Sequence, residues 1–244
     1  MSFSISPDEF SEFVRSRRSI RSFKPDPIPC EILNRILEDA KWAPSWTNTQ
    51  PYFLAIASGE TTKRLAKEYL QLFDDSLPAQ HGSKWAMVKM YLTGKGKPSW
   101  DYRTTIPYPE VLTPYRRKTG ADLYALLGID RKDRKARDAA WRRNFEFFGA
   151  PTVIFVFVHD GLKQFAAQDA GFMEQTLMLS ALANGLGTCA QGAIATWAGP
   201  VRKEFDIPEG YKFITAISIG YPDNHIVNTF NAGRREIDRQ EKSS

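Results

Sequence analysis

Arginine and serine are concentrated in one short segment near the N-terminus. From Arg15 to Phe23 the chain reads RSRRSIRSF. Guanidinium groups bind phosphate through paired hydrogen bonds, and serine hydroxyls add further donors. The segment therefore suits a phosphorylated ligand, and a solvated basic turn is the alternative that these residue types leave open.

Two further segments have side chains or backbone suited to a ligand. Trp42–Pro51 (WAPSWTNTQP) combines two indole rings with small polar groups, which suits the faces and the rim of a flat heteroaromatic ligand. Gly185–Gly192 (GLGTCAQG) contains glycines that allow a backbone to approach a ligand closely. Each also has a purely structural interpretation: a loop that ends a helix in the first case, and a helix cap followed by a strand in the second.

Several common catalytic and binding motifs do not occur in the sequence. It has no Rossmann fingerprint, no Walker A loop and no Gly-x-Ser-x-Gly elbow. The three histidines, His81, His159 and His225, are far apart and lack the spacing of metal ligands, so we expect no metal site. The two cysteines cannot form a disulfide framework, which favours a reducing compartment.

Composition and charge describe an ordinary globular chain. The 244 residues are 42% hydrophobic and carry a net charge of +5. Basic residues alternate with acidic ones, as in residues 130–138, so we expect no nucleic-acid partner. No apolar stretch approaches the length of a membrane span, and residues 1–7 lack the pattern of a secretory signal. We therefore expect no membrane partner and a cytoplasmic location.

Apolar periodicity and proline positions predict the elements that must position these segments. Helices are expected over residues 7–17, 29–43, 60–72, 130–147 and 166–184. Buried strands are expected over residues 52–58, 152–158 and 212–220, with short helices and loops over 75–120. Few strands among many helices predict a sheet sandwiched between helices. The polar tail from about Asn224 must find a partner surface or stay disordered.

In this order the three segments resemble the nitroreductase family. Arg17–Phe23 is similar to its Arg-Arg-Ser-x-Arg-x-Phe motif, and Ala43–Pro51 to its Ala-Pro-Ser-x-x-Asn-x-Gln-Pro motif. Gly185–Gly187 and the basic pair Arg234-Arg235 also match. The resemblance implies one domain over residues 1–244, with an insertion at about 75–130. It also implies an α+β fold with a central mixed, mainly antiparallel sheet between helices, and a C-terminal tail exchanged in a homodimer.

The same resemblance implies a flavin mononucleotide (FMN) held at the subunit interface. Its phosphate, ribityl chain and pyrimidine edge would be bound by Arg17, Arg18, Ser19 and Arg21, with Arg234 and Arg235 at the phosphate. Pro44, Ser45, Trp46 and Asn48 would reach in from the other subunit. Ala190, Gln191 and Gly192 would follow the reactive edge, and Asn144 is a further candidate for the pyrimidine edge. Many members carry Glu at the position of Gln191, which leaves open whether that residue acts through its backbone or its side chain.

The activity implied by the resemblance is a two-step reduction. NADH or NADPH would give hydride to flavin N5, and a small electron-poor aromatic, such as a nitroaromatic or a quinone, would then accept electrons. No side-chain catalyst is expected, because solvent can supply the protons. Trp46, Tyr102, Tyr108 and Tyr115 are candidates to shape the substrate pocket. Reductive dehalogenation, enone reduction or flavin breakdown on the same flavin, and non-catalytic flavin binding, are the alternatives.

Overall fold

The computed structural model describes residues 5–240, so residues 1–4 of the segment inspected for a secretory signal lie outside it. The α-helices in the described part are α1 (Pro7–Ser16), α2 (Cys30–Ala40), α3 (Glu60–Gln80), α4 (Lys84–Thr93), α5 (Thr113–Leu126), α6 (Arg134–Arg142), α7 (Gln164–Ala183) and α8 (Gly199–Glu204). The strands are β1 (Tyr52–Ser58), β2 (Thr152–His159), β3 (Gly187–Gln191) and β4 (Tyr211–Gly220). The fold therefore contains both helices and strands, as predicted.

The four strands form one sheet in the order β1-β2-β4-β3, with antiparallel neighbours throughout. A single parallel bridge, from Ser19 to Thr188, extends the sheet at its β3 edge. The predicted α+β fold with a mainly antiparallel sheet between helices is confirmed. Among the described residues nothing tests the exchange of the tail, which has no helix or strand after Thr229.

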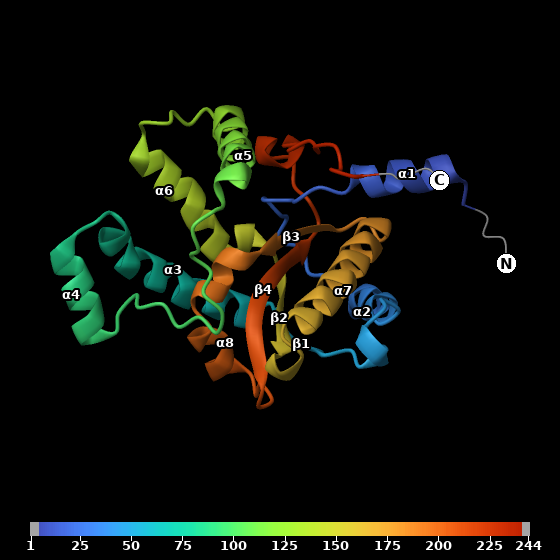
Figure 1. The fold of residues 1–244 in the computed structure, drawn as a ribbon, viewed down its shortest axis with the longest axis horizontal. Coiled ribbons are helices and arrows are strands. Elements are labelled where there is room, and N and C mark those ends of the chain that lie inside the picture. The colour runs from blue at the N-terminus through green and yellow to red at the C-terminus, as the bar shows by residue number, and fades with distance from the viewer. Residues whose placement is uncertain (1–4, 241–244) are drawn as a thin grey trace.

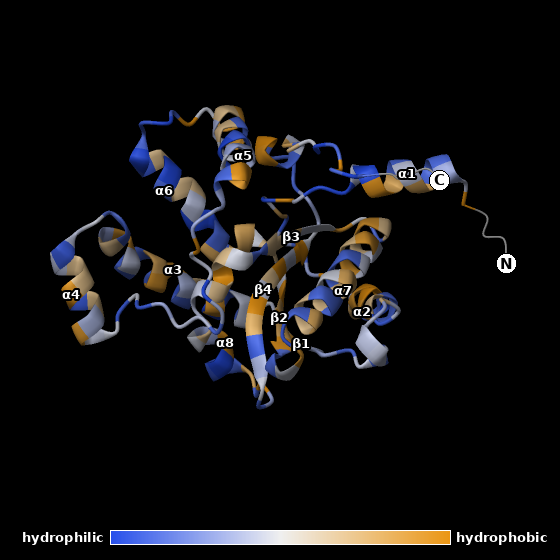
Figure 2. Cartoon of the chain, viewed as in Figure 1, coloured by the Kyte–Doolittle hydropathy of each residue, from blue (hydrophilic) through white to orange (hydrophobic). Residues whose placement is uncertain are grey.

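Helices cover both faces of the sheet (Figure 1). Side chains along β2 alternate between the two sides, because successive residues of a strand point to opposite faces. Val153, Phe155 and Phe157 join the core beneath α3, whereas Ile154 and Val156 join the core beneath α2 and α7. Each of these five residues is fully buried. The run of β-branched and aromatic residues thus reflects burial on both sides, and the strands are the most hydrophobic part of the ribbon (Figure 2).

Two helices stand at opposite ends of the molecule. Helix α1 lies at one end of the long axis and α4 at the other (Figure 1). Helix α1 begins with a capping box, in which Ser6 accepts from the N–H of Glu9 and the Glu9 carboxylate accepts from the N–H of Ser6. Neither helix has a buried residue. Both helices are therefore largely exposed within this chain, and α4 packs against α3 through half-buried residues.

The segment after α4 returns to the core through a set of polar contacts. Asp101 accepts hydrogen bonds of 2.7 Å from the Arg202 guanidinium and from the N–H of Phe213. The Tyr102 hydroxyl donates to Asp160 at 2.7 Å, and burial together with this bond raises the pKa of Tyr102 to about 12. These contacts fix the base of the predicted insertion on β4 and β2.

Two predicted helices have different lengths in the structure. The helix predicted over 60–72 continues to Gln80 and carries Pro78 in its last turn. The helix predicted over 130–147 begins at Arg134 and ends at Arg142. Residues 143–149 form a 3₁₀ turn in which Phe147 and Phe148 have φ near +52° and +56°, and this turn redirects the chain into β2. No helix among residues 5–240 has the length and apolarity needed to cross a bilayer.

Candidate functional site

The arginine- and serine-rich segment lies against the edge strand β3. Beside the Ser19–Thr188 bridge, the N–H of Ile20 donates to the carbonyl oxygen of Thr188 at 2.9 Å. A Cβ at Gly187 would lie 2.5 Å from Cγ1 of Ile20, so glycine is needed for this close approach. In the Gly-Leu-Gly motif, Gly185 caps α7 with φ +74° and Gly187 admits the segment.

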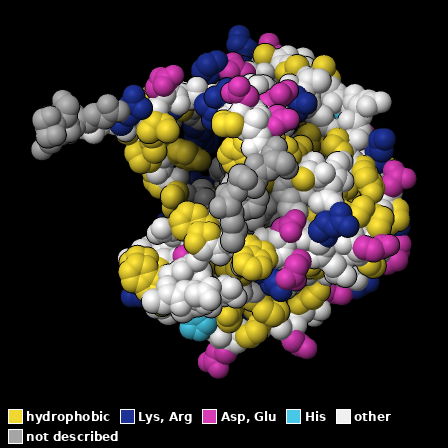
Figure 3. Space-filling model, turned by 90° about the vertical axis from the view of Figure 1, so that its right-hand side faces the viewer, with side chains coloured by type: hydrophobic (Ala, Val, Ile, Leu, Met, Phe, Trp, Pro, Cys, Tyr) yellow, Lys and Arg dark blue, Asp and Glu magenta, His cyan; other side chains and the backbone are white. Residues whose placement is uncertain are grey.

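A hollow of about 820 Å³ opens where this segment meets the C-terminal tail. We call it the cationic hollow, and none of the described residues that line it is acidic. Figure 3 shows a hollow on this side of the molecule, with Lys and Arg side chains at its edge and inside it. Five arginines line the cationic hollow: Arg15, Arg17, Arg18, Arg21 and Arg234. Such a concentration of cations without a carboxylate suits an anion.

Arg17 and Arg234 are close enough to influence each other. Burial, followed by the positive charge of Arg234, lowers the pKa of the Arg17 guanidinium. Both effects oppose the charged form, so an anion bound between the two residues would relieve them. Ser19 lines the same hollow. The structure thus brings together Arg17, Arg18, Ser19, Arg21 and Arg234 of the predicted phosphate site.

Arg235 is directed elsewhere. Its guanidinium donates to Asp238 at 2.7 Å and lies 5.2 Å from the centre of the Tyr115 ring. The hydrogen bond to Asp238 raises the pKa of Arg235. Arg235 is not among the residues that line the cationic hollow. Its predicted role at the phosphate therefore stays a prediction, to which this arrangement lends no support.

Arg21 lies between the cationic hollow and a second hollow of about 590 Å³, and it lines both. The guanidinium sits 5.8 Å from the centre of the Phe230 ring. The side-chain oxygen of Asn228 accepts from the N–H groups of Arg21 at 2.8 Å and of Ser22 at 3.2 Å. Asn228 and Phe230 were missed in the sequence, because nothing in a polar tail marks them as partners of an N-terminal arginine.

The second hollow is mostly apolar, and we call it the apolar hollow. Cys189, Ala190 and Phe148 contribute from the sheet side. Helices α5 and α6 contribute further apolar residues, among them Leu123, Tyr124, Ala136, Ala140 and Trp141, and Leu127 contributes from just after α5. Flat apolar walls beside a few polar groups are what an aromatic ring system requires. Helix α5 of the predicted insertion and helix α6, which follows that insertion, therefore form one wall of the candidate site.

Gln191 directs its side chain into the core. Its amide nitrogen donates to the carbonyl oxygen of Asn144 at 2.9 Å, and its amide oxygen accepts from the Ser218 hydroxyl. Only 3% of Gln191 is exposed, whereas the preceding Ala190 is exposed and lines the apolar hollow. With both ends of its side chain engaged in the core, Gln191 does not line either hollow, and neither does Gly192, so their predicted place along the reactive edge stays a prediction. Gly192 follows directly and is also exposed.

Asn144 lies at the boundary between the apolar hollow and the core. It lines that hollow, and its side-chain amide donates to the carbonyl oxygen of Trp141 at 3.0 Å. The strained turn at Phe147 and Phe148 follows three residues later. Such strain persists only where the surrounding structure enforces it, as it does at many functional sites.

The loop that contains Pro44, Ser45, Trp46 and Asn48 lies outside both hollows. Its conformation is well defined, because the N–H of Trp46 donates to Asp169 at 3.0 Å and the Trp46 ring lies 4.4 Å from that of Phe165. Its polar side chains face solvent, and Trp46 is 53% exposed. This loop is thus held in place by contacts with α7, and it does not line either hollow of its own chain.

The loop and the cationic hollow lie at different positions along α7. The loop contacts α7 at Asp169, whereas Gln175 lines the hollow. A rise of 1.5 Å per residue separates these two α7 positions by roughly 9 Å. The structure therefore does not bring the loop to the arginines in one chain.

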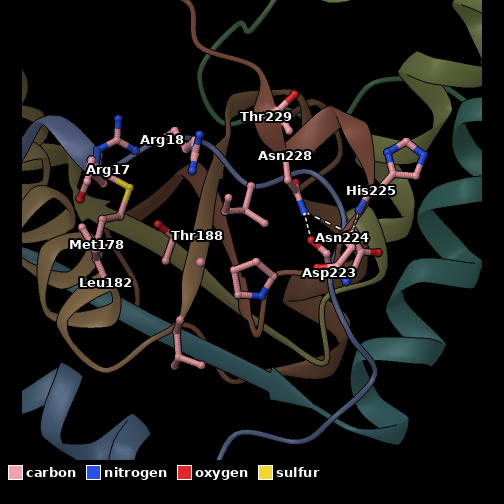
Figure 4. A pocket seen from close by; sticks show the side chains of 15 residues that line it. Arg17, Arg18, Met178, Leu182, Thr188, Asp223, Asn224, His225, Asn228 and Thr229 are labelled. Atoms are coloured by element: carbon pink, nitrogen blue, oxygen red, sulfur yellow. Dashed lines mark hydrogen bonds between the residues drawn. The ribbon is translucent and has the colours of Figure 1, made fainter. Parts of the chain in front are cut away.

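A third cavity, of about 460 Å³, lies beside the cationic hollow (Figure 4). Met178 and Leu182 of α7 line one part of it, and Asp223 lines another. Burial acts to raise the pKa of Asp223, but hydrogen bonds from Ser22 and His225 lower it below its usual value. An ionised carboxylate in the wall makes this cavity a poorer anion site than the cationic hollow.

Two of the residues suggested as substrate contacts are held elsewhere. Tyr102 is bonded to Asp160, and Tyr115 lies against Arg235. None of Trp46, Tyr102, Tyr108 and Tyr115 lines the apolar hollow of the described chain. Tyr124 and Trp141 line it instead. The sequence does not indicate which aromatic residues line the apolar hollow, because that depends on which faces of α5 and α6 lie near β3.

Comparison with known proteins gives a consistent result. The model of the nitroreductase family matches residues 14–221. The nitroreductase NfnB of Mycolicibacterium smegmatis is 32% identical over 211 residues, covering 86% of this chain and 82% of that protein. The 4-nitrobenzoate reductase of Pseudomonas putida is 30% identical over 231 residues, covering 93% and 92%. The solved structure of FMN-dependent NfnB from Mycobacterium smegmatis with NADPH superposes with a TM-score of 0.79 at 29% identity, over 96% of this chain and 98% of that one.

Proposed function

Because the chain belongs to the nitroreductase family, we propose that it is an FMN-dependent oxidoreductase that uses NAD(P)H to reduce nitroaromatic compounds. One observation carries this proposal. Two hollows meet at Arg21, one cationic and free of acidic lining residues, the other apolar and wide enough for a ring system. FMN has the matching shape, with a phosphate at one end and a flat heteroaromatic ring at the other.

The residues present fit this cofactor. Arg17, Arg18, Ser19 and Arg234 would hold the phosphate, whose negative charge would offset the two effects that lower the pKa of Arg17, burial and the charge of Arg234. The isoalloxazine ring would lie against exposed Ala190, with the backbone of Gln191 and Gly192 along its reactive edge. Bound FMN supplies the two-electron chemistry, taking hydride from NAD(P)H and passing electrons to the substrate.

The chain's own groups orient and stabilise these reactants. Arg21 would lie beside the pyrimidine edge, where its fixed charge stabilises negative charge that develops during reduction. Asn228 fixes the backbone of Arg21 by a hydrogen bond, so the Arg21 guanidinium would need to move little when negative charge develops on the flavin. Leu123 and Tyr124 would exclude water from the ring face. We assign no side chain as acid or base, since solvent can protonate the product.

We also propose that the protein is a homodimer whose partner protomer completes the site. Three features support it: a loop at Pro44–Asn48 that lines neither hollow of its own chain, helix α1 without a buried residue, and exposed Trp46 and Phe172 on or beside α7. Apolar exposure of this kind suits a contact between copies. The loop of one protomer would then cover the FMN of the other.

The acceptor that we propose is a nitro group. The relatives that match over most of the chain are named as nitroreductases and 4-nitrobenzoate reductases, which favours this acceptor over a halide, an enone or a quinone. A cytoplasmic location fits the free state of Cys30 and Cys189. NADPH is bound in one related structure, and we propose that this chain uses NADPH or NADH.

A spectroscopic experiment tests the function. Purified protein should carry a flavin absorbance band that heat releases as FMN, and NADPH or NADH should bleach the band under anaerobic conditions. Addition of 4-nitrobenzoate should restore the band. A protein that neither retains nor takes up FMN would overturn the proposal, and a band that neither donor bleaches would indicate flavin storage.

Complementation tests the shared site. An Arg17→Ala protomer and an Asn48→Ala protomer would be mixed and allowed to exchange. If each site uses both protomers, half of the dimers are mixed and contain one intact site, so about a quarter of all sites should regain normal FMN affinity. No recovery on mixing would show that each chain forms its site alone.

A further inference from the structure

Helix α4 lies at the end of the molecule opposite α1 (Figure 1), and several of its hydrophobic residues, coloured orange in Figure 2, are exposed. Trp85 is 79% exposed, Val88 52% and Leu92 80%. These residues are three and four positions apart, so they lie on one side of the helix. The inward side carries Ala86 and Met90, which are half-buried. The helix is therefore apolar on both sides, and only one of them is covered.

Lysines surround this exposed face. Lys84 and Lys89 flank the Trp85–Leu92 stripe, and Lys95 and Lys97 follow the end of the helix. The Lys97 ammonium lies 5.4 Å from the centre of the exposed Tyr91 ring. Residues 83–100 contain no Asp or Glu. The face is thus apolar in its centre and positively charged around it.

The proposed dimer leaves this face uncovered. The features that support that dimer are α1, α7 and the Pro44–Asn48 loop, and α4 lies at the opposite end of the long axis (Figure 1). A contact between two α4 faces would bring their lysines together, which costs free energy through like-charge repulsion. A second copy of the chain is therefore a poor partner for this face.

We propose that the α4 face, Trp85, Val88, Tyr91 and Leu92 with Lys84 and Lys89, binds the surface of an anionic phospholipid bilayer. A short helix can lie in the interface with its apolar side among the acyl chains while lysines contact anionic headgroups. Indole and phenol rings favour this boundary because one end of each ring is polar. The expected absence of a membrane partner depended on the lack of a spanning segment, and α4 binds without spanning.

Binding to a bilayer would bring the candidate active site close to apolar substrates dissolved in the membrane. Nitroaromatics partition into bilayers, and the insertion that contains α4 also supplies α5, which forms part of the wall of the apolar hollow. The lipid-binding face does not depend on the proposed reaction, because none of its residues lines either hollow.

Vesicle co-sedimentation of the full-length, FMN-loaded protein tests this inference. We expect binding to vesicles that contain phosphatidylserine, weaker binding as salt is raised, and little binding to pure phosphatidylcholine. The double variant Trp85→Ser/Leu92→Ser should lower the partition coefficient at least about tenfold, from the loss of apolar insertion. Lys84→Gln/Lys89→Gln should lower it about twenty-fivefold at low salt, at roughly fivefold per lysine.

Matched variants keep the test specific. Val111→Ser removes another exposed apolar side chain, and Lys24→Gln/Lys67→Gln removes two exposed lysines elsewhere; both should bind vesicles as the wild type does. FMN absorbance and nitroaromatic turnover without lipid report that each variant is folded. Binding that is absent, or that survives both α4 double variants, would overturn the proposal. A Trp85-dependent oligomer without vesicle binding would instead identify the face as a contact between copies.

Discussion

The side-chain oxygen of Asn228 accepts a hydrogen bond of 2.8 Å from the backbone N–H of Arg21. In return, the Asn228 amide donates to the carbonyl oxygen of Ser22 at 2.8 Å. Asn228 is only 8% exposed, so this pair of bonds is shielded from water. A residue near the C-terminus thereby fixes the segment that carries the arginines of the candidate FMN site.

Replacement of Asn228 should weaken FMN binding without removing a cation. In Asn228→Ala the two N–H donors lose their acceptor, at a cost of about 1–3 kcal/mol, and Arg21 loses its fixed position. Fluorescence titration should show a higher FMN dissociation constant, with a smaller effect for Asn228→Asp, which keeps the oxygen. Exposed Asn224 offers a control, and equal effects of Asn224→Ala and Asn228→Ala would contradict this role.

Removal of either arginine of the close pair should release FMN. Arg17→Ala or Arg234→Ala should raise the dissociation constant roughly tenfold or more, since hydrogen bonds to charged groups contribute about 1.5–3 kcal/mol. Arg235→Ala should change it less than about threefold, because Arg235 does not line the cationic hollow and its loss removes only an exposed ion pair with Asp238. A loss of affinity in Arg235→Ala as large as that in Arg234→Ala would show that both arginines bind the phosphate.

Substitution of Gln191 by methionine separates backbone from side-chain roles. Gln191→Met leaves the buried Ser218 hydroxyl without its acceptor and should cost about 1–3 kcal/mol in unfolding free energy. The rate of flavin reduction by NAD(P)H should stay within about threefold, because the backbone N–H groups that stabilise charge remain. Stopped-flow absorbance measures this rate, and a drop of a hundredfold in a folded variant would assign the side chain a direct role.

Gly187→Ala should disturb both stability and cofactor binding. The new Cβ would lie 2.5 Å from Cγ1 of Ile20, so the docked segment must shift, at a cost of about 1–3 kcal/mol. Chemical denaturation should show the loss, and FMN affinity should fall with it. A Cβ at Gly120 on α5 meets no neighbour, so Gly120→Ala should be neutral or stabilising by up to about 1 kcal/mol.

Glu174 on α7 should make stability depend on pH. Burial raises its pKa from 4.5 to about 7, so its neutral form is favoured in the folded state. The stability contribution of the neutral carboxyl is full below pH 4.5 and is lost as the pH rises through 7. Glu174→Gln should therefore match the wild type near pH 4.5 and exceed it at pH 8, by up to about 3 kcal/mol.

Thermal or urea unfolding at the two pH values measures this difference. Exposed Glu12 on α1 provides the matched control: Glu12→Gln should change the free energy of unfolding by the same small amount at both pH values. If Glu174→Gln brings no gain at pH 8, then the Glu174 carboxyl is solvated or has found a cation.

Most elements of the fold follow from local pattern. The run of β-branched and aromatic residues at 152–158 predicts a buried strand, which is β2, and the periodicities of residues 7–17 and 166–184 predict α1 and α7 to within a few residues. The turn at Phe147 and Phe148 was not predictable. Its positive φ values oppose the preference of aromatic residues, and tertiary packing enforces them.

The sequence by itself determined which residue types form the candidate site and in what order. The pairing of motifs at Arg17–Phe23 and Ala43–Pro51 was sufficient to indicate a phosphorylated, flat ligand. Tertiary structure alone decided orientation. In β3, opposite to Ala216 and Ile217 of β4, the register turns Gln191 into the core and Ala190 toward the apolar hollow. Successive strand residues must face opposite sides, but only pairing with β4 decides which of the two faces the ligand.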